Sequence, residues 1–187
     1  MEPIILTKFD VAERQLLQAI NMFFRNEDPV SIHTLAEAAS QVLNDIGKNY
    51  GAKSFLRDND LIRDDKKKEW LRLLFKSRNF FKHANKDKDS SHEFKEIFND
   101  FSILDATNMY TLIKKAWVPE TMAFQAWFAV AYPHLIKEGS EFSKVVEIAK
   151  NNGLLPDPKN RQLLYELIRT IREGEHVVAN INLKYGL

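Results

Sequence analysis

The sequence predicts an all-α protein, a single-domain helical bundle of about seven helices over residues 1–187. Apolar residues recur at spacings of three and four, which places them on one face of a helix. No segment alternates apolar and polar residues clearly enough to predict a strand. The six glycines and six prolines are few for 187 residues, which argues against a turn-rich sandwich or barrel.

The first two helices have clear boundaries. One is expected from about residue 10 to 25, with an apolar face that contains Val11, Leu16, Ala19, Ile20 and Phe23. The next begins at Pro29, with Asp28 as its N-cap, because proline suits the first helical position. It runs to about Ile46 and stops in the segment 47–51, which contains two glycines. Residues 52–63 fit no clear element.

A third helix is expected to begin at Asp64 and to end in a basic turn near His83, a charge distribution that matches the helix macrodipole. After a polar loop at 84–91, Ser90 or Ser91 is expected to cap a long fourth helix. The buried face of this fourth helix is expected to contain Phe94, Ile97, Phe98, Phe101, Leu104 and Leu112. Three more helices are expected at 122–132, which Pro133 ends, at 141–150 and at 160–172.

Composition excludes several classes of protein. Hydrophobic residues make up 44% and charged residues 28%, which is ordinary for a folded domain and too apolar for disorder. The absence of cysteine excludes disulfides and thiolate chemistry. Residues 1–8 lack the pattern of a signal peptide, and the apolar run 122–132 is too short to span a membrane. We therefore expect a cytoplasmic protein with no membrane partner.

Positive charge is concentrated in one segment. Residues 66–88 contain nine lysines and arginines against two acids, a net charge of +7. The rest of the chain carries 18 basic and 24 acidic residues, a net charge of −6. A concentrated basic patch next to an Arg and a His is typical of sites that bind phosphate groups.

Arg78 has an unusual position in this segment. On an ideal helix it lies in the middle of the apolar stripe, within about 60° of Leu71, Leu74 and Phe75. A charge there needs a carboxylate, several carbonyls or a bound anion, because an unpaired buried charge is costly. His83 lies about 140° from Arg78, so the two side chains cannot meet on a straight helix. A helix end near Lys82, or a two-fold dimer, is needed to bring them together.

The motif Arg78-Asn79-Phe80-Phe81-Lys82-His83 resembles the signature of HEPN domains, in which an Arg, commonly followed by a polar residue, is separated from a His by four to six intervening residues. The resemblance covers these six residues. It implies an all-α homodimer whose motif helices form the interface, and either a metal-independent endoribonuclease or a non-catalytic binding module. Some members carry a modified Tyr two residues after the His; Asn85 stands there, so that regulation is not expected.

The resemblance implies catalytic roles for three residues. Arg78 would stabilise charge on the phosphate, His83 would act as acid and base, and Asn79 would orient the site. Under this hypothesis a homodimer cleaves single-stranded or looped RNA by attack of the ribose 2′-OH, with no cofactor and no metal. The residues expected to hold RNA are Lys66, Lys67, Lys68, Arg72, Lys76 and Lys82, with Phe80 as a platform for a base.

Simpler interpretations stay open for the same residues. Arg78 could pair with a buried acid such as Asp100 or Asp105, and His83 could be a cation at a helix C-terminus. The lysines could form a solvated face, and Phe80 and Phe81 could belong to the core. The protein would then be a non-catalytic helical domain for dimerisation or partner binding.

Two other groups of residues offer weaker alternatives. His33 and Glu37, four residues apart, could contribute to a metal site, but a hydrogen-bonded pair on the surface is preferred because no second His stands at matching spacing. A pocket for a small molecule could be lined by the aromatic side chains of Trp117, Trp127, Phe128 and Tyr132. The motifs of nucleotide hydrolases, zinc proteases and α/β-hydrolases are absent from the sequence.

Overall fold

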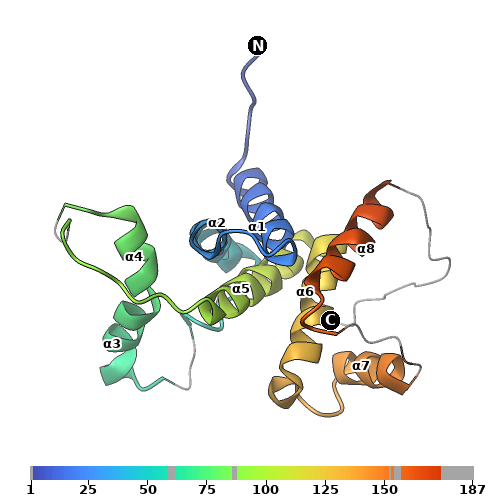
Figure 1. Cartoon of the computed structure of the whole chain (residues 1–187). Coiled ribbons are helices and arrows are strands. Elements are labelled where there is room, and N and C mark those ends of the chain that lie inside the picture. Colours follow the sequence, from blue (N-terminus) through green and yellow to red (C-terminus); the bar gives the residue numbers. More distant parts are fainter. Residues whose placement is uncertain (1, 59–61, 86–87, 152, 154–156, 174–187) are drawn as a thin grey trace.

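The computed structural model describes residues 2–58, 62–85, 88–151, 153 and 157–173 (Figure 1). Within these residues the regular structure is helical and no strand occurs, which confirms the all-α prediction. The α-helices are α1 (Lys8–Phe24), α2 (Pro29–Gly47), α3 (Asp64–Leu74), α4 (Lys76–Lys82), α5 (Ile97–Lys114), α6 (Pro119–Ala131), α7 (Glu141–Asn151) and α8 (Arg161–Glu173). Two short 3₁₀ helices follow α2 and α6, at Lys48–Tyr50 and Pro133–Leu135.

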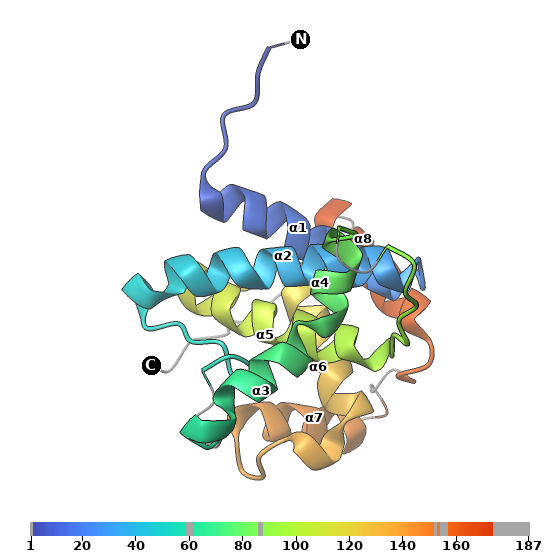
Figure 2. The ribbon, with the colours of Figure 1, turned by 90° about the vertical axis from the view of Figure 1, so that its left-hand side faces the viewer.

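The centre of the molecule is formed by α1, α2 and α5, with α2 packed between the other two. Helices α6 and α8 pack against α1, whereas α4 packs against α2 and connects to α3. The views in Figures 1 and 2 place α3 and α4 on one side of the central helices and α6 to α8 on the other. Residues 2–7 form an extended arm that leads away from the body.

The core on the α6 side is aromatic. The ring of Phe23 meets Trp127 edge to face with centroids 4.6 Å apart, and it meets Phe124 at 5.3 Å. Phe24 and Phe128 complete this group, and all five side chains are almost fully buried. Edge-to-face pairs of this kind contribute about 0.5–1.5 kcal/mol beyond the burial of their area. Two of the four aromatic residues assigned from the sequence to a possible pocket, Trp127 and Phe128, are therefore part of the core.

Helix caps fix the starts of α1 and α2. Asp28 accepts a hydrogen bond from the Ser31 amide at 2.7 Å and Pro29 occupies the first turn, as predicted. The start of α1 is set by a capping box that the sequence interpretation missed. In it the Thr7 hydroxyl accepts from the Asp10 amide at 3.1 Å, while the Asp10 carboxylate accepts from the Thr7 amide at 2.7 Å.

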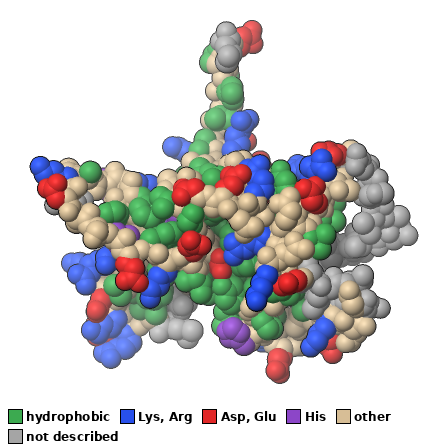
Figure 3. Space-filling model, viewed as in Figure 1, with side chains coloured by type: hydrophobic (Ala, Val, Ile, Leu, Met, Phe, Trp, Pro, Cys, Tyr) green, Lys and Arg blue, Asp and Glu red, His purple; other side chains and the backbone are tan. Residues whose placement is uncertain are grey.

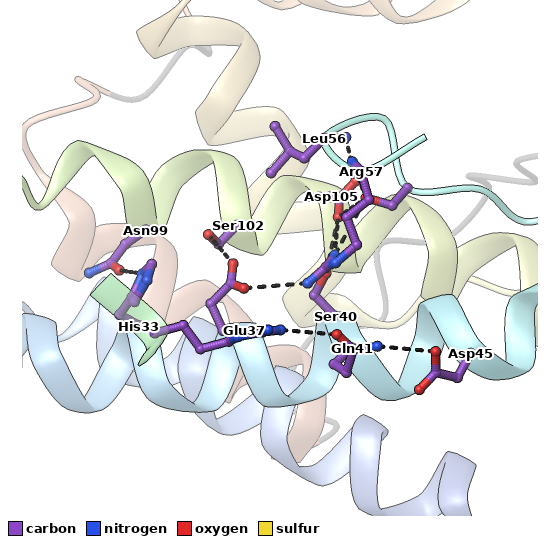
Figure 4. Close-up of polar contacts among 12 residues, drawn as sticks. His33, Glu37, Ser40, Gln41, Asp45, Leu56, Arg57, Asn99, Ser102 and Asp105 are labelled. Carbon is purple, nitrogen blue, oxygen red and sulfur yellow. Dashed lines mark hydrogen bonds and ion pairs between the residues drawn. The ribbon is translucent and has the colours of Figure 1, made fainter. Parts of the chain in front are cut away.

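The segment 52–58 is held against α2 and α5 by a buried charge network (Figure 4). The Arg57 guanidinium lies 3.1 Å from Asp105 of α5 and 3.3 Å from Glu37 of α2. Asp105 also accepts from the hydroxyls of Ser54 at 2.8 Å and Ser40 at 3.0 Å. Burial raises the pKa of the Asp105 carboxyl, and the hydroxyl of Ser54 and the charge of Arg57 oppose that rise. The carboxylate therefore depends on Arg57 for its charge compensation.

The predicted third helix is broken at Phe75, where φ is −92° and ψ is 6°, so that α3 and α4 are separate helices. The ring of Phe75 lies between two guanidinium groups, 5.2 Å from Arg57 and 3.9 Å from Arg78. On α3 the Trp70 indole N–H donates to the Leu56 carbonyl at 2.7 Å, and no residue of α3 is fully buried. The basic segment is thus anchored through the network around Arg57.

The fourth predicted helix begins later than expected, at Ile97, so neither Ser90 nor Ser91 is its N-cap. Residues 88–96 run back along α4 instead, so that the ring of His92 lies against Phe80 of α4. Phe94 still packs inward, with its ring 5.2 Å from that of Phe81. The helices expected at 141–150 and 160–172 are present as α7 and α8.

We expect Arg57→Met to lower the free energy of unfolding by about 3–5 kcal/mol, because it leaves two buried carboxylates without a counter-charge. Urea denaturation monitored by circular dichroism measures this change. Arg63→Met is the matched control, since it removes an exposed pair with Asp65 that is worth at most about 1 kcal/mol. Equal losses in the two variants would contradict the prediction.

Candidate functional site

An open cleft of about 650 Å³ lies between the α3–α4 segment and the loop that leads to α5. The lining residues come from the second half of α3, from α4 and from the loop that follows. They are Arg72, Lys76, Asn79, Phe80, His83, Asn85, Ser90, Ser91 and His92. The cleft therefore combines two cations, two imidazoles, several amide and hydroxyl groups and one aromatic ring.

The wall of the cleft is fixed by a cluster of aromatic and histidine rings, which we call the α4 ring cluster (His33, Phe80, Phe81, His92 and Phe94). The His92 ring lies 5.0 Å from that of Phe80, and its Nε2 atom is 2.9 Å from the Ser77 hydroxyl. The rings of Phe81 and Phe94 both contact His33, at 5.7 Å and 5.0 Å. This cluster joins the loop, α4 and α2 into one packed unit.

The structure brings four of the predicted site residues together with His83. Helix α4 ends at Lys82, and His83 has extended backbone angles (φ −131°, ψ 112°), with its amide donating to the Asn79 carbonyl at 3.1 Å. A helix end near Lys82, one of the two ways in which Arg78 and His83 were expected to meet, is present, but it does not bring Arg78 into the cleft with His83. The exposed His83 side chain lines the same cleft as Arg72, Lys76, Asn79 and Phe80.

Arg78 is placed elsewhere. Its guanidinium covers the ring of Phe75 at 3.9 Å and donates to the side-chain oxygen of Gln41 on α2 at 2.9 Å. The Gln41 amide nitrogen in turn donates to Asp45 at 3.0 Å, which orients the amide for Arg78. Burial lowers the pKa of the Arg78 guanidinium, and the nearby charge of Glu37 opposes this effect. Arg78 does not line the cleft.

The acids proposed as partners for Arg78 have other contacts. Asp105 pairs with Arg57, and Asp100 accepts from the Tyr132 hydroxyl at 2.5 Å. Gln41, a neutral residue on α2, takes the position that the sequence assigned to a carboxylate.

The remaining predicted RNA contacts lie outside the cleft. Lys66, Lys68 and Lys82 are exposed and Lys67 is half-buried, while Lys66 forms an exposed pair with Glu69 at 3.3 Å. Figure 3 shows Lys and Arg side chains gathered over the end of the molecule that α3 occupies. These lysines can attract a polyanion toward the cleft, but they do not line it.

Several residues of the cleft were not predicted from the sequence. Ser90 or Ser91 was expected to cap a helix and His92 was given no role in the site, whereas all three line the cleft beside Asn85. No periodic signal marks these residues, because their position depends on a loop that crosses α4. The one signal available was local: Ser90, Ser91 and His92 directly follow the basic segment.

His33 and Glu37 are buried, 2% and 1% exposed, so the expected surface pair is wrong. Asn99 donates to the Pro29 carbonyl at 3.0 Å, which leaves its side-chain oxygen to accept from His33 Nδ1, also at 3.0 Å. The other ring nitrogen, Nε2, is buried and has no hydrogen-bond partner within the described residues. This burial lowers the pKa of His33 below its ordinary value and keeps the ring neutral.

Comparisons of the chain with models of known protein families, with curated proteins and with solved structures find no match. In the part of the chain that the structure describes, no three His, Asp or Glu side chains are grouped so that they could hold a metal ion. None of the described helices has both the length and the apolar character needed to cross a membrane.

We expect the free energy of unfolding to fall as the pH is lowered below 6.5, the ordinary pKa of His33. Below this pH the histidine of the unfolded chain takes up a proton, whereas the buried ring of the folded protein does not. The free energy of unfolding therefore falls by up to about 1.4 kcal/mol per pH unit. Urea denaturation between pH 7.5 and 5.5 measures this loss. His33→Gln keeps a donor for Asn99, and its free energy of unfolding should depend less on pH than that of the wild type. The same dependence on pH in the wild type and the variant would contradict the assignment of this effect to His33.

Proposed function

We propose that the protein binds single-stranded or looped RNA in the cleft and cleaves it as a metal-independent endoribonuclease. The observation that supports this most is the presence of His83, Asn79, Arg72 and Lys76 on one open cleft with an aromatic ring. The resemblance to HEPN domains points to the same chemistry through His83 and Asn79.

RNA binding in this proposal rests on charge and stacking. Arg72 and Lys76 hold two successive phosphates through charge-assisted hydrogen bonds. Because these contacts are made to the backbone, they carry no sequence information. The exposed lysines at 66, 68 and 82 attract the strand over a longer range. Phe80 is half-buried against His92, so a base would stack on the part of its ring that faces the cleft.

Cleavage would proceed by attack of the 2′-OH on the adjacent phosphorus. His83 takes the 2′-OH proton, the 2′-oxygen–phosphorus bond forms, and the bond to the 5′-oxygen breaks. The leaving oxygen takes a proton from His92, which acts as the imidazolium and becomes neutral, and which Ser77 holds in the cleft wall. The products end in a 2′,3′-cyclic phosphate and a 5′-OH, and no metal or cofactor takes part.

Arg78 can take part in this mechanism only if the contacts of its guanidinium change. For it to stabilise the phosphorane, its guanidinium would have to leave Gln41 and the ring of Phe75, or a homodimer would have to bring it to another copy's cleft. Within one chain, Arg72 and Lys76 are the cations placed for that role. We therefore propose that Arg78 positions α4 against α2.

A second candidate function is a non-catalytic domain for dimerisation or partner binding. The observation that favours it is an apolar stripe on α8, in which Leu163, Leu167 and Ile171 are 54%, 47% and 41% exposed. Their spacing of four residues places them on one face of the helix. Such a face is typical of a contact surface.

We expect the double variant Arg72→Gln/Lys76→Gln to bind an unstructured RNA oligonucleotide at least about tenfold more weakly, because each charge-assisted hydrogen bond is worth on the order of 1.5 kcal/mol. The slope of log affinity against log salt should decrease by about 1.4, the value for two lost contacts to a single strand. Fluorescence anisotropy at several salt concentrations measures both quantities.

The matched control for binding is Lys8→Gln/Lys137→Gln, which removes the same charge at exposed positions outside the cleft. An equal loss of affinity in the control would mean that net charge alone determines binding. Undiminished binding by the cleft variant would rule out the cleft as the RNA site.

We expect His83→Ala to lower the rate of RNA cleavage in EDTA by about 100-fold or more, the usual contribution of a general base. His134→Ala, an exposed histidine beyond α6, should leave the rate unchanged. Gel assays of an RNA pool, with detection of cyclic phosphate ends, measure this. Absence of cleavage by the wild type, or equal rates in all three proteins, would contradict the catalytic proposal.

A further inference from the structure

A second cavity, of about 360 Å³, lies among the starts of α2, α5 and α8 and the residue after α6. It shares no lining residue with the RNA cleft. Its lining residues are Phe23, Asn26, Glu27, Pro29, Ile32, Glu96, Ile97, Asn99, Asp100, Tyr132 and Arg161. An inference about this cavity therefore stands independently of the proposed function.

Arg161 presents unused hydrogen-bond donors to this cavity. Its guanidinium carbon lies over the ring of Phe23, 3.8 Å from the centroid, and 5.1 Å from the centroid of Trp127. Among the described residues, none accepts a hydrogen bond from the guanidinium or places a carboxylate within 4.0 Å of it. Burial lowers the pKa of Arg161, and attraction to Asp100 opposes this effect. Two aromatic rings thus hold a half-buried cation whose five N–H groups have no acceptor among the residues that the structure describes.

Asp100 presents an unused acceptor to the same cavity. The residue is 6% exposed, and one carboxylate oxygen, Oδ2, accepts from the Tyr132 hydroxyl. No donor to the other oxygen, Oδ1, is found in the described part of the chain. Burial raises the pKa of the Asp100 carboxyl, and the hydrogen bond from Tyr132 opposes the rise. A ligand that donates to Oδ1 would therefore satisfy a carboxylate that the fold has almost removed from water.

Arg161 and Asp100 attract each other but do not form an ion pair, and both side chains line the cavity. A ligand with a single charge would meet a like charge: an anion meets Asp100 and a cation meets Arg161. Of the acids at the rim, Glu27 is already paired with Arg25 at 2.8 Å. A small molecule that carries both charges complements the pair and connects the two side chains.

We propose that this cavity binds a free α-amino acid. The carboxylate of the ligand accepts from the Arg161 guanidinium, in the two-bond geometry that guanidinium groups favour. Its ammonium group donates to Asp100 Oδ1, with Glu96 at the rim adding negative potential. The side chain of the ligand packs against Ile32, Ile97 and the accessible part of Phe23, so apolar amino acids are favoured over charged ones.

The test is a binding screen of the full-length protein with each of the twenty common amino acids. Thermal denaturation finds the ligands, since a molecule that binds the folded state raises the melting temperature, and titration calorimetry gives the dissociation constant. We expect at least one apolar amino acid to bind. Failure of all twenty to bind would overturn the proposal.

Two derivatives of the best ligand test the role of each charge on the wild-type protein. The methyl ester removes the negative charge of the carboxylate, and the N-acetyl derivative removes the ammonium group. Each should bind at least about tenfold more weakly, a difference of about 1.4 kcal/mol. Undiminished binding of either derivative would overturn the two-charge site.

Variants assign the site to its residues. Asp100→Asn and Arg161→Met should each weaken binding of the amino acid by about tenfold or more, while Arg169→Met, at an exposed position of α8 outside the cavity, should not. Equal affinity for the amino acid in the wild type and all three variants would overturn the assignment of the site to Asp100 and Arg161. RNA binding should stay unchanged in Asp100→Asn, so a failure here is distinguishable from a failure of the RNA proposal.

Discussion

The structure depends on the contact of one buried guanidinium with two buried carboxylates. Arg57 connects a segment without regular structure to α2 through Glu37 and to α5 through Asp105. A buried pair of this kind adds little net stability over a hydrophobic replacement, but it is costly to break by removing one partner. Its effect is to specify where the segment 52–58 lies. Helix α3 and the break at Phe75 are connected to this contact through Trp70 and the ring of Phe75.

The cleft is the clearest consequence of that constraint. The carbonyl of Leu56 receives the indole N–H of Trp70, and the ring of Phe75 packs beside the guanidinium of Arg57. These contacts set the direction of α3 and the break before α4. The α4 ring cluster then draws the following loop back over α4, which brings His92 into the cleft with His83. The arrangement of charges in the cleft therefore follows from packing at a distance from it.

The sequence was sufficient to predict the helical class and the start of α2, because caps and apolar spacing are local signals. It placed Arg78 on a buried face correctly, since periodicity reports which face is covered. It could not identify Gln41, 37 positions earlier, as the partner, because periodicity says nothing about which element covers a face. The break at Phe75 was missed for the same reason: no glycine or proline marks it, and contacts with two arginines accompany it. His92 was missed because a loop places it.

The lack of a fully buried residue on α3 has a consequence for motion. Local opening of a helix costs free energy in proportion to the contacts that it loses, and α3 has few. Its amide protons would then exchange with solvent long before those of α2 and α5, which contain most of the buried polar network. The wall of the cleft that Arg72 forms can therefore open locally at a lower cost in free energy than the central helices.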